Sequence, residues 1–145
     1  MVILAPAIAT NMTWTPFLAI NKERYRVIRT YKDLEDVPRG IFLVLSTSMV
    51  GKLKRDLMRF VKLSSRKLCL VFDESDEITN PSSQRTKHIL AVFRRLKYKI
   101  LDTGTTTRNN IAELYSQFEL LYNNSVNMTC WCSSIYHENR DKEIE

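Results

Sequence analysis

The chain has 145 residues, of which 44% are hydrophobic, which is enough apolar material for one globular unit with a core. Its 22 Lys and Arg residues outnumber its 16 Asp and Glu residues, and the net charge of +6 makes nucleic acid a candidate partner. No stretch approaches transmembrane length, and the apolar start lacks a basic leader, so we expect no membrane partner. The uneven cysteine count favours a reducing, intracellular setting, and Cys130, Cys132 and His137 match no common zinc spacing.

The first part of the chain alternates short apolar segments with helical patterns. Strands are predicted at residues 2–5, 25–29 and 41–45. After the first strand, Trp14, Phe17 and Leu18 follow helical spacing, with Asn11 or Thr13 as the cap. Residues 33–40 predict a loop, and residues 51–63 predict a basic amphipathic helix.

The second part continues the alternation, which predicts an α/β fold with a mostly parallel sheet. Strands are predicted at residues 68–72 and 98–101, and Cys69 in the first of these is expected in the core. One helix is predicted from Ser82 or Ser83 to about residue 96, and another over residues 111–121. The basic faces of the helices at residues 51–63 and 82–96 are either phosphate contacts or solvated surface.

The run at residues 68–72 predicts a strand that is buried on both faces, and it ends abruptly in acids. Asp73, Glu74 and Asp76 follow it directly, at the edge where open α/β sheets bind ligands. The first acid can hold Mg²⁺ and the second can orient or deprotonate a water, as nucleoside triphosphate hydrolysis requires. Taken alone, this segment is equally compatible with a solvated acidic turn.

A second polar turn follows the next predicted strand. Asp73 and Thr103 are each at the carboxyl end of a strand, with one helix between the two strands. A right-handed βαβ crossover places these two strand ends on the same edge of the sheet. We therefore expect the acids and the turn Thr103-Gly104-Thr105 to face one crevice.

These two segments together resemble a known family. FDESDEITNPSSQRTK, from residue 72, and DTGTTTRNNIAELYSQFELL, from residue 102, are similar to motifs II and III of the Swi/Snf-type ATPases in helicase superfamily 2. VILAPAIATNMTW resembles motif Ia and IFLVLSTSMV resembles motif Ib, so the resemblance covers about residues 1–122 and leaves 123–145 as a polar, charged tail. It implies an incomplete RecA-like three-layer sandwich that lacks the phosphate-loop strand.

The resemblance also implies roles for individual residues. Asp73 would reach the Mg²⁺ of Mg-ATP and Glu74 would polarise the attacking water. Asp76 replaces the usual histidine of the family, as aspartate does in DEAD-type relatives, and would couple the site to motif III. The residues that would couple the nucleotide site to the DNA-facing side are Thr103, Gly104 and Thr105. The residues that would lie beside the nucleic acid are Ala5, Pro6, Ser46 and Thr47, with Lys52 and Lys54 as phosphate contacts.

The sequence also departs from the family pattern. Ser75 replaces an alanine, Asp102 an apolar residue and Thr106 a proline. None of the three glycines belongs to a G-x-x-x-x-G-K-[ST] phosphate loop, and the second RecA-like domain is missing as well. Hydrolysis of a triphosphate requires the phosphate loop and the second RecA-like domain, so we do not expect this chain to hydrolyse ATP alone. Without the phosphate-loop strand, residues 98–101 should form an exposed apolar edge that favours self-association or a covering segment.

Three hypotheses follow. The first is a fragment of a Swi/Snf-type ATP-dependent translocase on double-stranded DNA, whose partner is the remainder of the motor. The second is a non-enzymatic nucleic-acid or protein interaction module that retains a degenerate helicase fold. The third is a metal-dependent hydrolase that uses Asp73, Glu74 and Asp76 without histidine support.

Overall fold

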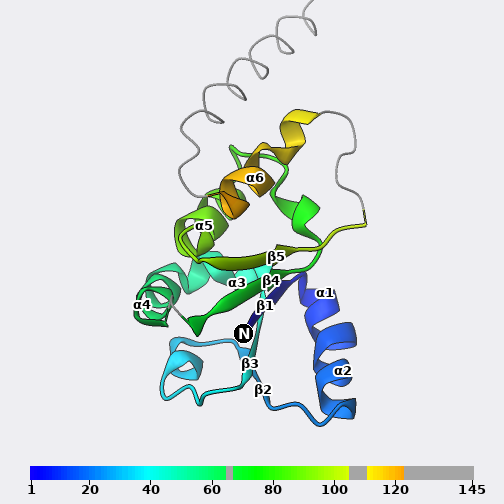
Figure 1. Ribbon diagram of the computed structural model, residues 1–145, viewed down its shortest axis with the longest axis vertical. Coiled ribbons are helices and arrows are strands. Elements are labelled where there is room, and N and C mark those ends of the chain that lie inside the picture. The colour runs from blue at the N-terminus through cyan, green and yellow to red at the C-terminus, as the bar shows by residue number, and fades with distance from the viewer. Residues whose placement is uncertain (65–66, 105–110, 123–145) are drawn as a thin grey trace, which may run out of the picture.

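The strands of the computed structural model form one parallel sheet in the order β2-β3-β1-β4-β5 (Figure 1). The structure describes residues 1–64, 67–104 and 111–122. The strands are β1 (Val2–Ala5), β2 (Tyr25–Ile28), β3 (Phe42–Ser46), β4 (Cys69–Phe72) and β5 (Tyr98–Leu101). Each predicted strand is therefore confirmed to within one residue at either end, and the α/β fold class is confirmed.

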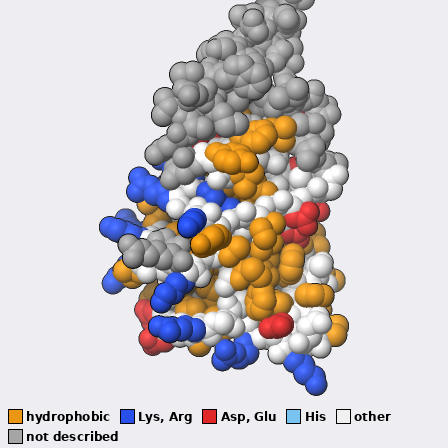
Figure 2. Space-filling model, viewed as in Figure 1, with side chains coloured by type: hydrophobic (Ala, Val, Ile, Leu, Met, Phe, Trp, Pro, Cys, Tyr) orange, Lys and Arg blue, Asp and Glu red, His pale blue; other side chains and the backbone are white. Residues whose placement is uncertain are grey.

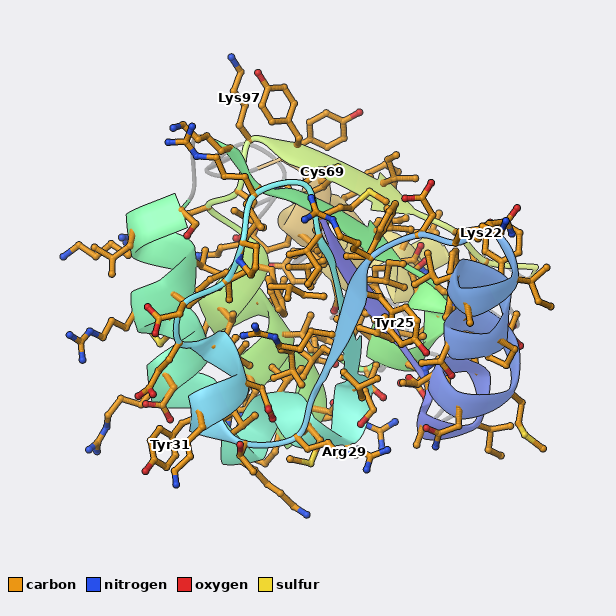
Figure 3. All side chains as sticks on the ribbon, turned by 90° about the horizontal axis from the view of Figure 1, so that it is seen from below. Lys22, Tyr25, Arg29, Tyr31, Cys69 and Lys97 are labelled. Carbon is orange, nitrogen blue, oxygen red and sulfur yellow. The ribbon has the colours of Figure 1, made fainter. Side chains whose placement is uncertain are left out.

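The helices lie on both faces of the sheet (Figures 1 and 3). The helices that follow β1 are α1 (Ala7–Ala9), a π-helical turn (Thr10–Trp14) and α2 (Thr15–Ile20). The remaining helices are α3 (Thr47–Lys52), α4 (Lys54–Ser64), α5 (Gln84–Phe93) and α6 (Tyr115–Leu121), with short 3-10 turns at Tyr31–Leu34, Ser75–Ile78 and Ile111–Leu114. None of the helices in the described part of the chain is long and apolar enough to cross a membrane.

Alternate residues of the strands enter two different cores. Leu4 is paired with Leu45 and Phe72 in the register, and all three are buried in the core beneath the helices from α3 to α6. Ile3 points to the other face, where it packs with Val44 and with Leu18 of α2. The period-two alternation of a strand thus divides one apolar run between two layers.

The second face of the sheet is covered only over its first strands. Cys69 and Val71 of β4 are half-buried, and Tyr98 and Ile100 of β5 are 50% and 56% exposed. Figure 2 shows a band of hydrophobic side chains across the middle of the face that it displays. The prediction that residues 68–72 are buried on both faces is therefore wrong for the outer face, and so is the core position of Cys69, because no described helix lies over β4 and β5 on that side. The exposed apolar edge predicted at β5 is confirmed.

Two predicted helices begin earlier than expected. The helix around Trp14 starts at Ala7, directly after Pro6, rather than at a cap at Asn11 or Thr13, and Phe17 is 55% exposed. Proline fixes the extended residue before the first turn, so it begins the helix without a side-chain cap. The helix predicted from Gly51 starts at Thr47 and is interrupted at Leu53. Helix α5 starts at Gln84, next to the predicted start at Ser82 or Ser83, and Ser83 caps it with its Oγ accepting from the backbone N–H of Thr86 at 3.1 Å.

The chain turns at Asp33 after leaving β2. The Oδ2 atom of Asp33 accepts hydrogen bonds from the backbone N–H groups of Arg29 at 2.9 Å and Thr30 at 2.7 Å. These two donors, that of Arg29 first, hold the pKa of Asp33 below its usual range. The carboxylate thereby fixes the backbone of Arg29 at the carboxyl end of β2.

We expect Asp33→Asn to lower the free energy of unfolding at neutral pH by less than about 1 kcal/mol, because the carboxylate is largely exposed. The folded-state pKa is depressed, so the contribution is present above the unfolded pKa of about 4 and is lost as the pH falls through the folded value. Thermal unfolding of both chains at neutral pH and in acid measures this. A difference in stability that is unchanged in acid would contradict the role of the charge.

Helices α3 and α5 come close at Gly51. A Cβ atom at this position would lie 2.7 Å from Nδ1 of His88 on α5, which is inside van der Waals contact. Glycine is otherwise a poor choice inside a helix, so the close approach of α5 explains it.

We expect Gly51→Ala to lower the free energy of unfolding by about 1–2 kcal/mol, since the overpacking exceeds the helix propensity gained. In a His88→Ala background, the same substitution should instead raise it by up to about 1 kcal/mol, because only the propensity remains. Urea unfolding of the four chains measures both values. Equal effects in the two backgrounds would contradict the contact.

Candidate functional site

Backbone hydrogen bonds join the carboxyl ends of β1, β4 and β5. The N–H of Asp73 donates to the carbonyl of Leu4 at 2.8 Å, and the N–H of Asp102 donates to the carbonyl of Phe72 at 2.8 Å. The N–H of Ser75 then donates back to the carbonyl of Asp102 at 3.0 Å. The structure thus brings the acids and the start of the Thr103 turn to one edge, as the crossover geometry predicts, while Thr105 lies outside the described residues.

Glu74 has a left-handed backbone conformation, with φ 56° and ψ 50°. This region costs a residue with a Cβ atom about 1–2 kcal/mol, so the surrounding structure must hold it in place. The turn separates the acids: the side chain of Glu74 is exposed, whereas Ser75 and Asp76 are buried in the 3-10 turn that follows. Asp73 is half-buried between them and the end of β1.

The separation of the acids limits how a metal ion can bind. Within the described ranges, no group of three or more His, Cys, Asp and Glu side chains is arranged to hold a metal ion. This geometry does not support the metal-dependent hydrolase. A single carboxylate oxygen of Asp73 fits Mg²⁺, which is usually bound through one or two carboxylates together with substrate phosphates.

A hydrogen bond from Trp14 reaches the first acid. The Nε1–H group of Trp14 donates to Oδ2 of Asp73 at 2.7 Å, across 59 positions of sequence. Helical spacing indicated only an apolar role for Trp14. The sheet order could have revealed the contact, because β1 and β4 are neighbours and the helix that carries Trp14 starts where β1 ends.

A cavity of about 430 Å³ lies at the carboxyl ends of β2 and β3. Its lining residues are Ala7, Thr10, Asn11, Val27, Ile28, Arg29, Ser46, Ser48 and Met49. The polar groups are hydroxyls, an amide and one guanidinium, and the Oγ atoms of Ser46 and Ser48 are 2.9 Å apart. Figure 3 shows Arg29 at the end of β2, away from Tyr25 at its start.

The residues expected beside a nucleic acid are placed differently from one another. Ser46 lines the cavity, whereas Ala5 and Thr47 are 0% and 4% exposed and offer almost no surface. Pro6 begins the first helix, and Lys52 and Lys54 flank the junction of α3 and α4, outside the cavity lining. The sequence did not identify Asn11, Arg29 and Ser48 as ligand contacts, because the cavity that they line exists only once β2 lies beside β3.

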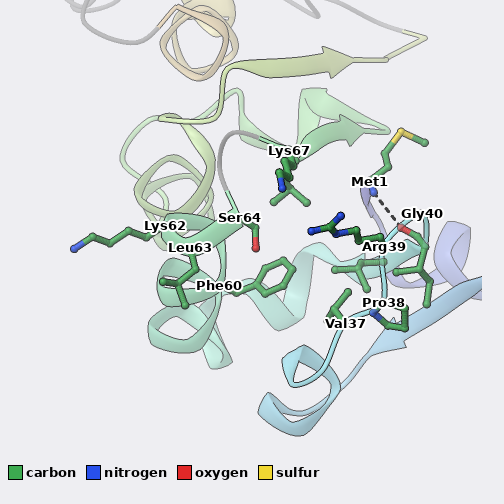
Figure 4. A pocket seen from close by; sticks show the side chains of 13 residues that line it. Met1, Val37, Pro38, Arg39, Gly40, Phe60, Lys62, Leu63, Ser64 and Lys67 are labelled. Atoms are coloured by element: carbon green, nitrogen blue, oxygen red, sulfur yellow. Dashed lines mark hydrogen bonds between the residues drawn. The ribbon is translucent and has the colours of Figure 1, made fainter.

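A larger hollow of about 650 Å³ lies at the opposite, amino-terminal edge of the sheet (Figure 4). Arg39, Phe60 and Lys67 are among its lining residues, and no acid is. Although this hollow is larger, open α/β sheets bind ligands at the carboxyl ends of their strands, where the acids lie. We therefore assign the candidate site to the carboxyl edge.

The comparisons with known proteins support the fold. No protein-family model matches the chain, and no curated protein matches its sequence. A solved structure, the Sulfolobus solfataricus SWI2/SNF2 ATPase core in complex with dsDNA, superposes with a TM-score of 0.63 at 18% sequence identity. The match covers 85% of this chain and 25% of that one, so the chain spans about a quarter of its length. The chain therefore has the fold of part of a SWI2/SNF2 ATPase core.

Proposed function

We infer that the chain is part of the first motor domain of a Swi/Snf-type DNA translocase. The observation that carries this proposal is the carboxyl edge, on a fold similar to a SWI2/SNF2 ATPase core. There, backbone hydrogen bonds of Asp102 to Phe72 and Ser75 join the turn that carries Asp73 and Glu74 to the chain that continues into Thr103. In the complete motor, the activity would be ATP-driven movement along double-stranded DNA without strand separation.

Each acid has a role that fits its surroundings. Asp73, half-buried at the sheet edge, would bind the Mg²⁺ of Mg-ATP, and the exposed Glu74 would orient the attacking water. Asp76 is buried and is suited to connecting the acid turn with the chain that follows β5 rather than to contacting the nucleotide. In that chain, Thr103, Gly104 and Thr105 would pass the state of the nucleotide to the DNA-facing side.

The cavity at the ends of β2 and β3 would contact the DNA backbone. Hydroxyl, amide and guanidinium groups are the side-chain donors that proteins use for phosphate oxygens, and Ser46, Ser48, Asn11 and Arg29 supply them. Lys52 and Lys54 would add contacts at the junction of α3 and α4. Because phosphate contacts carry no direct sequence information, binding should be weak, independent of sequence and sensitive to salt.

The remainder of the motor would complete the sheet. Parallel sheets are normally covered on both faces, yet among the described residues no helix covers the outer face of β4 and β5 and no strand pairs with the far edge of β5. A strand that carries a phosphate loop would pair with the edge of β5. A helix over Val71 and Ile100 would cover the outer face. Self-association through the same edge stays a prediction.

A second function is a nucleic-acid or protein interaction module without catalysis. It is favoured by the absence of a G-x-x-x-x-G-K-[ST] loop from these 145 residues. A motor fragment would hydrolyse ATP within the complete motor, and this turnover would depend on Glu74. A non-catalytic module would show no turnover that depends on Glu74 under any conditions.

Titration of the chain with Mg²⁺ and fluorescent ATP should give no saturable binding and no turnover, because these 145 residues contain no G-x-x-x-x-G-K-[ST] loop to bind the phosphates. Glu74→Gln is the matched variant, since it keeps the shape of the side chain and removes its charge. Saturable binding with turnover that is lost in Glu74→Gln would show that the chain is a complete ATPase and would overturn the fragment proposal.

Duplex DNA with a fluorescent label should bind with an affinity that falls steeply as salt is raised. Arg29→Ala should weaken binding to different sequences uniformly and should reduce the slope of log affinity against log salt by about 1, because one phosphate contact is lost. Arg39→Ala at the opposite edge is the control and should keep the wild-type slope. Identical slopes for wild type and Arg29→Ala would contradict the proposed DNA surface.

A further inference from the structure

Trp14 makes a contact that the proposed chemistry does not yet use. Its indole N–H can only donate, and at 2.7 Å it holds Oδ2 of the half-buried Asp73 carboxylate. Hydrogen bonds to a charged acceptor are about twice as strong as neutral ones. The bond holds the Oδ2 atom of this carboxylate in place and thereby also orients its Oδ1 atom.

The π-helical turn sets the direction of Trp14. The N–H of Thr15 donates to the carbonyl of Thr10, so the turn Thr10–Trp14 contains one residue more than an α-helical turn. The extra residue rotates the following chain by about 100° around the helix axis. Such turns occur frequently at functional sites.

Contacts on both sides of Trp14 hold this segment against the sheet. Before it, the buried hydroxyl of Thr10 donates to the carbonyl of Pro6 at 3.0 Å. After it, Leu18 is buried against Ile3 and Val44, and Trp14 packs on the same cluster. The indole therefore has little freedom to move unless the whole segment moves.

The same helical segment lines the cavity proposed for DNA. Ala7, Thr10 and Asn11 form one wall of this cavity, and Arg29 and Ser46 lie among the residues from the neighbouring strands. One rigid segment of the chain thus touches the cavity through its first turns and the candidate metal carboxylate through Trp14.

We propose that Trp14 is a positioning residue for Asp73 and that it couples this carboxylate to occupancy of the cavity by a DNA backbone. The coupling rests on the proposed function, whereas the positioning rests on the hydrogen bond alone. A phosphate bound against Asn11 and Arg29 shifts the segment, and the shift reaches Asp73 through the indole. The coupling therefore reaches Asp73 through the helical segment that follows β1, and it does not involve the turn at Thr103 after β5.

The indole N–H resonance of Trp14 tests the positioning directly. The chain has two tryptophans, and Trp131→Phe leaves only Trp14. An isotope-labelled chain with this substitution gives one indole peak in a proton–nitrogen correlation spectrum. Asp73→Ala should shift this peak upfield and speed its exchange with water, and Asp73→Asn, which keeps an oxygen acceptor, should give a smaller shift. Asp102→Asn, an exposed acid at the same edge, is the control and should leave the peak in place. If Asp73→Ala does not fold, Asp73→Asn alone decides, and an unmoved peak overturns the positioning role.

Addition of a short DNA duplex tests the coupling. Binding is followed by anisotropy in the same samples, and the indole peak should move in proportion to the bound fraction. Arg29→Ala should reduce the anisotropy change and the peak movement in the same proportion at a given duplex concentration, and Arg39→Ala should leave both at their wild-type size. If the duplex binds and the peak does not move, the coupling is overturned while the proposed function stands. If no duplex binds, the proposed function and the coupling fail together, and the comparison of Asp73 variants still decides the positioning.

Discussion

The structure depends on the parallel pairing of β1 with β4 at their carboxyl ends. The N–H of Asp73 donates to the carbonyl of Leu4, so the first acid is fixed by the backbone of a strand that lies almost seventy residues earlier in the chain. The helix that begins at Ala7 leaves from the same end of β1. One backbone pairing therefore places the acid beside the strand from which the first helix starts, and the indole of Trp14 on that helical segment donates to Asp73 at 2.7 Å.

The edge separates three acids, Asp73, Glu74 and Asp76, that lie within four residues of sequence. The backbone of Glu74 is in the left-handed conformation, so the chain turns directly after Asp73. The two residues after Glu74, Ser75 and Asp76, are buried. Burial and exposure then give the acids different chemical environments, although they have the same carboxylate chemistry. The conformational cost at Glu74 is of the kind found where function, rather than stability, selects a backbone conformation.

The strands followed from the sequence because alternation and apolar runs report local structure, whereas the burial of Cys69 on the outer face was overestimated because it depends on which helices cover that face. The two strand ends could also be brought together, since the handedness of a βαβ unit is almost invariant. The contact of Trp14 with Asp73 and the cavity beside Arg29 could not be predicted, because both depend on which strands become neighbours. The start of the first helix was misplaced because Pro6 begins it without a polar cap, and the π-helical turn has no signature in spacing.

The open outer face of β4 and β5 ties the stability of this chain to whatever covers it. A partner that binds only the folded state adds a free energy that grows with its concentration, about 2.7 kcal/mol at a hundred times its dissociation constant. Tyr98 and Ile100, exposed in the chain alone, would move into a core on assembly. With the proposed partner bound, the melting temperature of this protein would rise with the partner's concentration, set by mass action as well as by the chain's own packing.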